Sequence, residues 1–192
     1  PVGEDQKQHV ELARDIAQRF NALYNVDFFV VPQPVIPKVG ARVMGLDDPT
    51  VKMSKSLADR RGHAIRLLDG PDEVLYAFKR AVTDSGREIR YSTDPEKAGV
   101  NNLLGIYQAV TGKDRDAVEA DFAAARGYGD LKVGVAEVVI ETLRPIQIRY
   151  RELMDDAAEL DRLLAYGAEQ ARAVSQPKVD EMKRIMGLVV PG

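Results

Sequence analysis

Two lysines and two serines stand within five residues, in the run Lys52-Met53-Ser54-Lys55-Ser56. Such a run offers two ammonium groups and two hydroxyl groups as hydrogen-bond donors, which can close around an anion that has several oxygens. Residues 51–66 hold five lysines and arginines against one aspartate, although the whole chain has a net charge of −3. This local charge favours the binding of a phosphate chain.

The residues around this run indicate how it is positioned. Asp47-Asp48-Pro49 favours a turn just before it. A helix beginning at Leu57 would add its N-terminal amides to the anion site. The alternative is a solvated surface loop rich in lysine, without a bound anion.

A second polar run lies at the start of the chain, in Gly3-Glu4-Asp5-Gln6. A glycine-containing turn into a helix can present Asp5 and Gln6 to the hydroxyl groups of a ribose. The alternative is ordinary capping of the helix that follows. The chain therefore has two candidate sites for parts of a nucleotide.

Composition narrows the chemistry. The chain has no cysteine, which excludes a thiolate metal site, a cysteine nucleophile and a disulfide scaffold, and fits a reducing compartment. The two histidines have plain interpretations: His9 is solvated or caps its helix, and His63 lines the anion site. No protein-bound metal is predicted. The longest apolar runs are far too short to cross a bilayer.

Residues 1–70 are predicted to mix helix, strand and loop. Apolar residues at spacings of three and four predict a helix over about residues 6–25. The apolar residues 28–31 predict a short buried strand, and the prolines after it predict an extended segment. A helix followed by a buried strand is typical of the last units of a parallel α/β sheet, so this part is expected to be incomplete on its own.

The rest of the chain is predicted to be almost entirely helical. Pro71, followed by Asp72 and Glu73, favours a helix start, and Gly112 favours a helix end. A long helical pattern runs over about residues 130–174. We expect Pro145 to kink or break it, and Pro177 to separate a last short helix that ends at Gly187. The predicted division is therefore 1–70, 71–174 and 175–192.

The run Lys-Met-Ser-Lys-Ser resembles the signature loop of the class I aminoacyl-tRNA synthetases. The sequences flanking it are similar to those of the bacterial tryptophanyl-tRNA synthetases. The similarity extends over nearly the whole chain and is clearest in residues 36–49, 79–85, 99–104, 127–132 and 143–146. The sibling tyrosyl enzymes have a related loop but do not usually share these flanking sequences.

The resemblance implies a fold that is α/β plus all-α. It places the C-terminal end of a Rossmann-like parallel-sheet catalytic domain, residues 1–70, before a helical bundle domain that carries the tRNA anticodon-binding surface. It implies the attachment of tryptophan to tRNA(Trp) through an aminoacyl-adenylate, with ATP as a substrate and Mg²⁺ as its counter-ion. It also implies a cytoplasmic homodimer that has no membrane partner.

The resemblance also assigns roles to individual residues. Lys52 and Lys55 are the expected catalytic residues, because they would hold the departing pyrophosphate. Ser54 and Ser56 would add hydrogen bonds, and Met53 would anchor the loop. Val43 would place backbone groups near adenine, and Gly3, Asp5 and Gln6 would face the ribose. The expected ATP-binding residues are Gly3, Glu4, Asp5, Gln6, Val43, Lys52, Met53, Ser54, Lys55 and Ser56.

One family feature is not found in these 192 residues. The first nucleotide-binding signature of this family is a turn containing histidine, and neither His9 nor His63 stands in such a context. We therefore expect this chain to supply one half of the active site and to be inactive alone. Two alternatives stay open: a tyrosyl-type class I synthetase, and a non-catalytic paralogue or fragment that binds RNA or protein.

Overall fold

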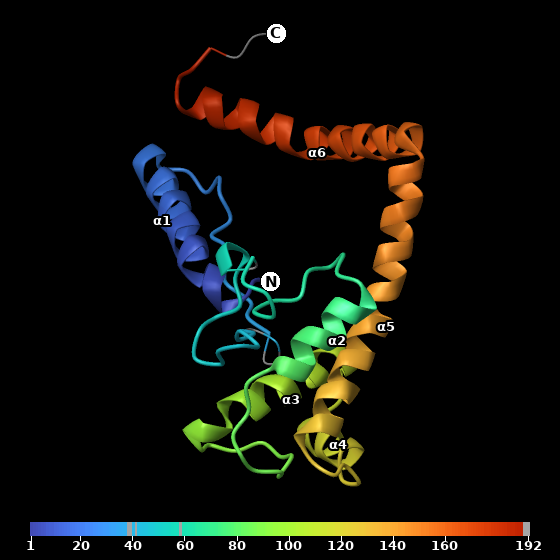
Figure 1. Ribbon diagram of the computed structural model, residues 1–192. Helices are drawn as coiled ribbons and strands as arrows, with labels where there is room; N and C mark the ends of the chain where they lie inside the picture. The colour runs from blue at the N-terminus through green and yellow to red at the C-terminus, as the bar shows by residue number, and fades with distance from the viewer. Residues whose placement is uncertain (38–39, 41, 58, 190–192) are drawn as a thin grey trace. The chain divides into compact units, whose positions relative to one another are not determined.

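The computed structural model describes residues 1–37, 40, 42–57 and 59–189. The chain divides into two compact units, each described here by itself. The first unit consists of Pro1–Val35 and Arg149–Gly192, and the second is Ile36–Ile148. Figure 1 shows the helices of both. This division follows packing, and the predicted boundaries at residues 70 and 174 stay a prediction.

In the first unit, a 3₁₀ turn (η1, Glu4–Gln6) leads into helix α1, Lys7–Tyr24. The predicted helix over residues 6–25 is thus confirmed. It ends at Asn25, whose φ of 51° is in the left-handed region, where Asn is tolerated better than most residues. The aromatic rings of Phe20, Phe28 and Phe29 pack together, with centroids 4.7 to 5.7 Å apart.

The predicted strand at residues 28–31 is wrong, because that segment has no regular secondary structure. The side chain of Asn21 makes the backbone hydrogen bonds that a neighbouring strand would otherwise make. Its Oδ1 accepts from the backbone N–H groups of Phe28 and Phe29, and its Nδ2 donates to the Phe29 carbonyl. These backbone groups are satisfied from α1, so they have no need of a sheet ladder.

Over the described residues, the one β pairing is an isolated antiparallel bridge between Met44 and Lys52, and no strand is formed. The helical part of the predicted fold is confirmed, whereas the parallel-sheet part is not. A parallel sheet needs several strands that pair with one another, and the described residues provide none.

The second unit is built around helices α2 (Pro71–Arg80), α3 (Ala98–Thr111), α4 (Arg115–Asp121) and the first part of α5 (Tyr128–Asp155). Pro71 occupies the first turn of α2, and Gly112, with a φ of 70°, ends α3, as predicted. Two short 3₁₀ turns, η2 (Lys55–Leu57) and η3 (Pro95–Lys97), complete the unit. Its core is one cluster of apolar side chains that includes Phe78, Leu103, Leu104, Leu131 and Val135.

The predicted long helix over residues 130–174 is two helices, and Pro145 is not where the chain breaks. Helix α5 continues through Pro145, and α6 (Ala157–Ile185) continues through Pro177. Each proline deprives the carbonyl four residues before it of a partner. Both carbonyls belong to exposed residues, Glu141 and Ala173, which water can reach. The break falls at Asp156, whose carboxylate accepts from the N–H of Glu159 and caps α6.

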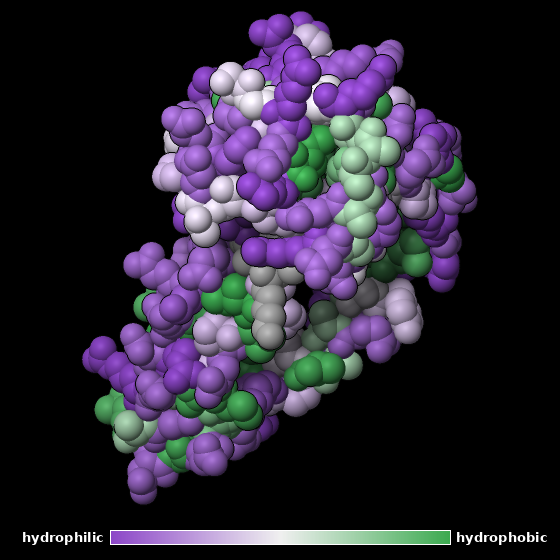
Figure 2. Space-filling view, turned by 90° about the horizontal axis from the view of Figure 1, so that it is seen from below, coloured by the Kyte–Doolittle hydropathy of each residue, from purple (hydrophilic) through white to green (hydrophobic). Residues whose placement is uncertain are grey.

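Figure 2 shows one face, on which hydrophilic side chains cover most of the area and apolar side chains form small groups. Across the described ranges, each helix is too short or too polar to cross a bilayer.

Candidate active site

The signature segment, residues 52–56, is held at its start by a short antiparallel pairing. Gly45 donates to the Val51 carbonyl at 2.8 Å, and Met53 donates to the Val43 carbonyl at 3.0 Å, on either side of the Met44–Lys52 bridge. Residues 43–45 and 51–53 therefore run side by side in opposite directions. This pairing fixes the direction in which the chain enters the signature segment.

The predicted turn before the segment is present and spans residues 48–51. The Val51 N–H donates to the Asp48 carbonyl at 3.2 Å. The Asp48 carboxylate accepts from the Thr50 hydroxyl at 2.6 Å and from the Thr50 N–H at 2.9 Å. These two hydrogen bonds hold the pKa of Asp48 below its ordinary value, since they favour the charged form. A charged Asp48 therefore stabilises the turn at neutral pH.

Within the signature segment, the described side chains divide between the core and the surface. Met53 is partly buried and packs against the core cluster. The Ser54 and Ser56 hydroxyl oxygens lie 3.1 Å apart, so the two donors can act on one anion. Lys52 is half-buried. The backbone of Lys55 begins η2, and its side chain lies outside the described part of the chain.

A helix beginning at Leu57, which would have added its N-terminal amides to an anion site, is not found in the described residues 59–70. The chain instead makes three successive turns, in which the N–H groups of Leu57, Arg60 and His63 donate to the carbonyls of Ser54, Leu57 and Arg60. Gly62, with a φ of 85°, supplies the left-handed residue that this path needs. The N-terminal amides of a helix are therefore not available to an anion here.

Helix α3 holds the backbone that pairs with the start of the signature segment. The side chain of Asn102 makes two hydrogen bonds to the backbone of Met44, accepting from its N–H at 3.0 Å and donating to its carbonyl at 2.9 Å. Val43, expected near adenine, lines a cavity of about 330 Å³ together with residues of α3 such as Asn101. The second unit thus brings Val43 and the signature segment together.

The other predicted residues, Gly3, Glu4, Asp5 and Gln6, belong to the first unit, whereas the signature segment belongs to the second. Gly3 is the N-cap of η1 and Gln6 is that of α1, and neither makes a side-chain cap hydrogen bond. Instead, the exposed Gln6 side chain donates to Asp5 at 3.0 Å and contacts His9 at 2.8 Å.

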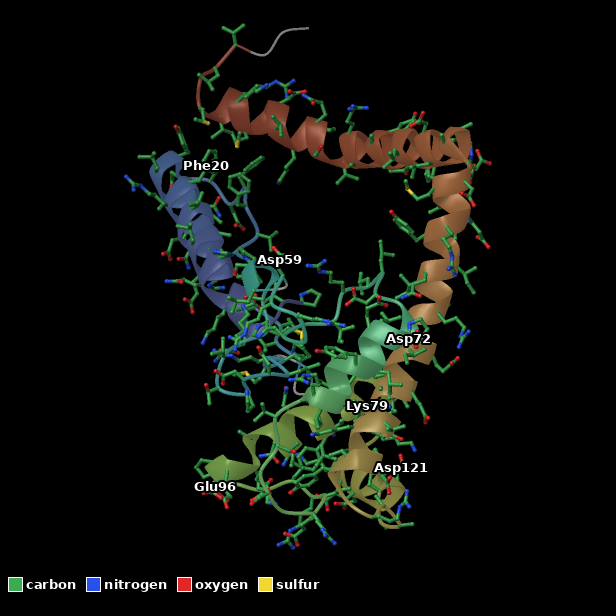
Figure 3. All side chains as sticks on the ribbon, viewed as in Figure 1. Phe20, Asp59, Asp72, Lys79, Glu96 and Asp121 are labelled. Carbon is green, nitrogen blue, oxygen red and sulfur yellow. The ribbon has the colours of Figure 1, made fainter. Side chains whose placement is uncertain are left out.

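Several of the cations after the signature segment are engaged within the protein. Arg60 pairs with Asp47 and Arg66 pairs with Asp59, each at 2.6 Å. The guanidinium of Arg61 lies over the Tyr76 ring, 4.0 Å from its centroid. Figure 3 shows Asp59 in this loop and Asp72 on α2. The positive charge counted over residues 51–66 is therefore partly neutralised within the protein.

The sequence suggested that His63 lines the anion site, but the structure buries it. It is fully buried, and its Nδ1 lies 2.7 Å from Asp47 Oδ1. Sequence reasoning missed both this contact and that of Asn102, because each joins residues with no periodic relation to one another. Over the described residues, no group of three or more histidine, aspartate or glutamate side chains could hold a metal ion.

Comparison with known proteins defines the class. Residues 1–144 match the family model of the class I tRNA synthetases (W and Y), and the chain belongs to this family. The chain is 51% identical to the tryptophan–tRNA ligase of Wolinella succinogenes over 98% of its own length and 56% of the relative. It is 53% identical to that of Mycobacterium leprae over 91% of its length and 50% of the relative.

Solved structures give the same result. Tryptophanyl-tRNA synthetase from Mycoplasma pneumoniae matches 99% of this chain and 58% of its own, with a TM-score of 0.86 and 32% identity. The Campylobacter jejuni enzyme, solved with ADP and tryptophan, matches 98% of this chain and 56% of its own, with a TM-score of 0.66 and 29% identity. The chain thus spans little more than half the length of these relatives.

Proposed function

We propose that this chain supplies the phosphate-binding half of an enzyme that activates tryptophan with ATP and transfers it to tRNA(Trp). The observation that carries the proposal is the placement of residues 52–56. Two lysines and two serines follow a backbone pairing that α3 supports, in a chain 51% identical to a tryptophan–tRNA ligase. Donors on such a fixed base are preorganised for an anion.

In the proposed reaction, a carboxylate oxygen of tryptophan forms a bond to the α-phosphorus of ATP, and the bond from that phosphorus to the pyrophosphate oxygen breaks. Negative charge moves onto the departing pyrophosphate. Lys52 and Lys55 neutralise that charge, while the Ser54 and Ser56 hydroxyls donate hydrogen bonds. ATP enters with Mg²⁺ as its counter-ion, and no protein-bound metal is part of the proposal.

The adenosine part of ATP is assigned to two places. The cavity beside Val43 has the volume to admit a nucleobase, which supports the assignment of adenine to it. Gly3, Asp5 and Gln6 are proposed to face the ribose, with Glu4 also among the ATP-binding residues, and the exposure of the Asp5 and Gln6 side chains supports this role. The helical residues 71–174 are proposed to carry the anticodon-binding surface. Assembly as a homodimer stays a prediction.

The test uses the 192-residue chain in place of the 189 matching residues of the Wolinella succinogenes ligase. We expect this graft to catalyse tryptophan-dependent exchange between pyrophosphate and ATP. Lys55→Ala should lower kcat by about 10²- to 10³-fold while the KM for tryptophan changes less than about threefold. Lys79→Ala, an exposed lysine on α2 (Figure 3), is the matched control and should leave kcat unchanged.

The alternatives predict other results from the same graft. Exchange that depends on tyrosine would indicate a tyrosyl-type enzyme. A graft that binds tRNA but shows no exchange with either amino acid would indicate a binding module. Equal losses in kcat and in tryptophan affinity for Lys55→Ala would contradict the proposed role of that lysine in the transition state.

A further inference from the structure

His63 is the charged or polar side chain that the second unit buries most completely, with 0% of its surface exposed. Its Nε2 has no hydrogen-bond partner among the described residues. Burying a polar atom without a partner costs free energy, and an apolar side chain of similar size would avoid that cost. A buried imidazole is therefore favourable here only if its other nitrogen, Nδ1, makes an interaction that offsets the cost of burying Nε2.

That other nitrogen makes a directed contact. Nδ1 lies 2.7 Å from Asp47 Oδ1, and because a carboxylate only accepts, Nδ1 carries the proton and donates it. The second carboxylate oxygen of Asp47 accepts from Arg60 Nε at 2.6 Å. Asp47 precedes the signature segment, whereas Arg60 and His63 follow it. One carboxylate thus joins the two ends of the loop that carries Lys52–Ser56.

The backbone and a glycine fit this arrangement. The Leu46 N–H donates to the His63 carbonyl at 3.0 Å, so His63 holds the start of the loop by its main chain and its side chain. A Cβ at Gly45 would lie 2.5 Å from the imidazole Cε1 and 2.7 Å from Nδ1. Residue 45 must therefore lack a side chain for the ring to occupy its place.

We propose that Asp47, Arg60 and His63 form a clamp that closes the base of the signature loop, with His63 as a positioning residue. This inference rests on the proposed function, since it is the ATP phosphates that the positioned donors would meet. Fixing both ends of the loop lowers the number of conformations open to Lys52 and its neighbours, so less ordering remains when the anion binds. His63 does not touch the substrate, because its ring is sealed from solvent.

The test separates the two imidazole nitrogens. The amide nitrogen of Asn can occupy the place of Nδ1, whereas that of Gln occupies the place of Nε2. In the graft, His63→Asn should keep kcat for pyrophosphate exchange within about threefold, because it retains a donor to Asp47. His63→Gln should lower kcat by about 10- to 30-fold while the KM for tryptophan stays within about twofold.

Two further variants test the clamp at exposed positions, so the result does not depend on replacing the buried His63 side chain. Arg60 is largely exposed, so Arg60→Gln should fold normally and lower kcat by about three- to tenfold. Asp59→Asn breaks the neighbouring Asp59–Arg66 pair outside the clamp and should leave kcat unchanged. A melting temperature is measured for each variant, since a merely structural role would lower kcat and stability together, equally for Asn and Gln at position 63.

Hydrogen exchange in the 192-residue chain without ATP provides an independent readout. The amides of Gly45 and Met53, which form the pairing at the base of the loop, should exchange faster in His63→Gln and Arg60→Gln than in His63→Asn. Unchanged exchange at both amides would overturn the clamp. If Lys52→Ala and Lys55→Ala leave pyrophosphate exchange intact, the proposed function fails, and the amide measurement still decides the clamp. If the lysine variants are impaired but His63→Gln and Arg60→Gln are not, the clamp alone is wrong.

Discussion

The two units of this chain bury their apolar side chains to very different extents. Among the described residues of the second unit, a cluster of sixteen buried residues joins α2, α3, α4 and α5. In the described residues of the first unit, Ala17 is the one buried side chain, while Leu12, Ile16 and Leu23 on α1 are more than half exposed. Apolar burial is the dominant stabilising term in folding, so the second unit has the means to hold its own structure and the first has much less.

This difference matters for the candidate site, because the signature segment rests on the better-packed unit. Met53 and Leu46 tie the loop to the core, and Asn102 binds it to α3. The polar run from Gly3 to Gln6 belongs to the unit with little core. The residues proposed to bind phosphate are therefore expected to be preformed, and those proposed to bind ribose are expected to rearrange more easily.

The sharpest test of this contrast substitutes one leucine in each unit. Leu104 on α3 is 0% exposed and Leu12 on α1 is 59% exposed. Leu104→Ala should lower the free energy of unfolding by about 2–5 kcal/mol, because it leaves a cavity in the core. Leu12→Ala should change it by less than about 0.5 kcal/mol. Urea unfolding followed by circular dichroism measures both, and similar losses would contradict the contrast.

A second test uses one helical glycine from each unit. A Cβ on Gly99 in α3 would lie 2.0 Å from the Val82 carbonyl oxygen, whereas one on Gly167 in α6 would meet no atom within 4 Å. Gly99→Ala should therefore cost about 1–3 kcal/mol, because the backbone itself must move. Gly167→Ala should stabilise α6 by about 0.5–1 kcal/mol, because alanine loses less conformational entropy in a helix. Thermal unfolding distinguishes the opposite signs.

The sequence predicted best where a local signal decides the structure. Pro71 with Asp72 and Glu73 marks the start of α2, and Gly112 marks the end of α3, since dipole and backbone preferences act within one turn. The Lys-Met-Ser-Lys-Ser run and its flanking sequences likewise indicated the synthetase family, which the family model confirms. The capping signal of Asp156 with Glu159 is equally local, and it marks where α6 begins.

Prediction failed where the outcome depends on distant partners. The apolar residues 28–31 suit a strand, but Asn21 satisfies their backbone instead. His63 reaches Asp47 across sixteen residues, and no periodic pattern announces such a contact. Propensity is a weak prior that tertiary contacts override, and side chains that bind loops to one another have no regular spacing.

A smaller effect is expected from acid. In the second unit, Asp84 accepts from Lys97 at 3.0 Å and from the Tyr128 hydroxyl at 2.9 Å. Burial raises the pKa of Asp84, but hydrogen bonds from the Gly86 N–H, Lys97 and Tyr128 outweigh it and hold the pKa below the ordinary 3.8. A carboxyl with a lowered folded pKa stabilises the fold above its unfolded pKa, and this contribution is lost as the pH falls toward the folded value.

Asp84→Asn should therefore flatten the loss of stability as the pH falls below about 4. The matched carboxyl in the first unit is Glu159, whose pKa is lowered by hydrogen bonds from Arg162 on the surface of α6. Solvent screens this exposed pair, so Glu159→Gln should leave the acid profile nearly unchanged. Urea unfolding midpoints measured as the pH is lowered test both variants. An equal flattening of the pH dependence in the two would show that burial does not make the Asp84 contribution larger than that of Glu159.

The smallest expected effect concerns a contact between α6 and Phe28 within the first unit, which has little apolar core. Lys178 on α6 donates to the Phe28 carbonyl at 2.8 Å, and its ammonium lies 3.8 Å from the centroid of the Phe28 ring. An exposed cation over an aromatic ring contributes about 0.5–1 kcal/mol. Lys178→Gln should lower the stability of the first unit by about that amount and leave Leu104 and its neighbours in α3 as protected as before. Amide exchange read unit by unit measures this, with Lys183→Gln on the same helix as the control. Equal deprotection of both units by Lys178→Gln would mean that they unfold together, which would remove the contrast between them.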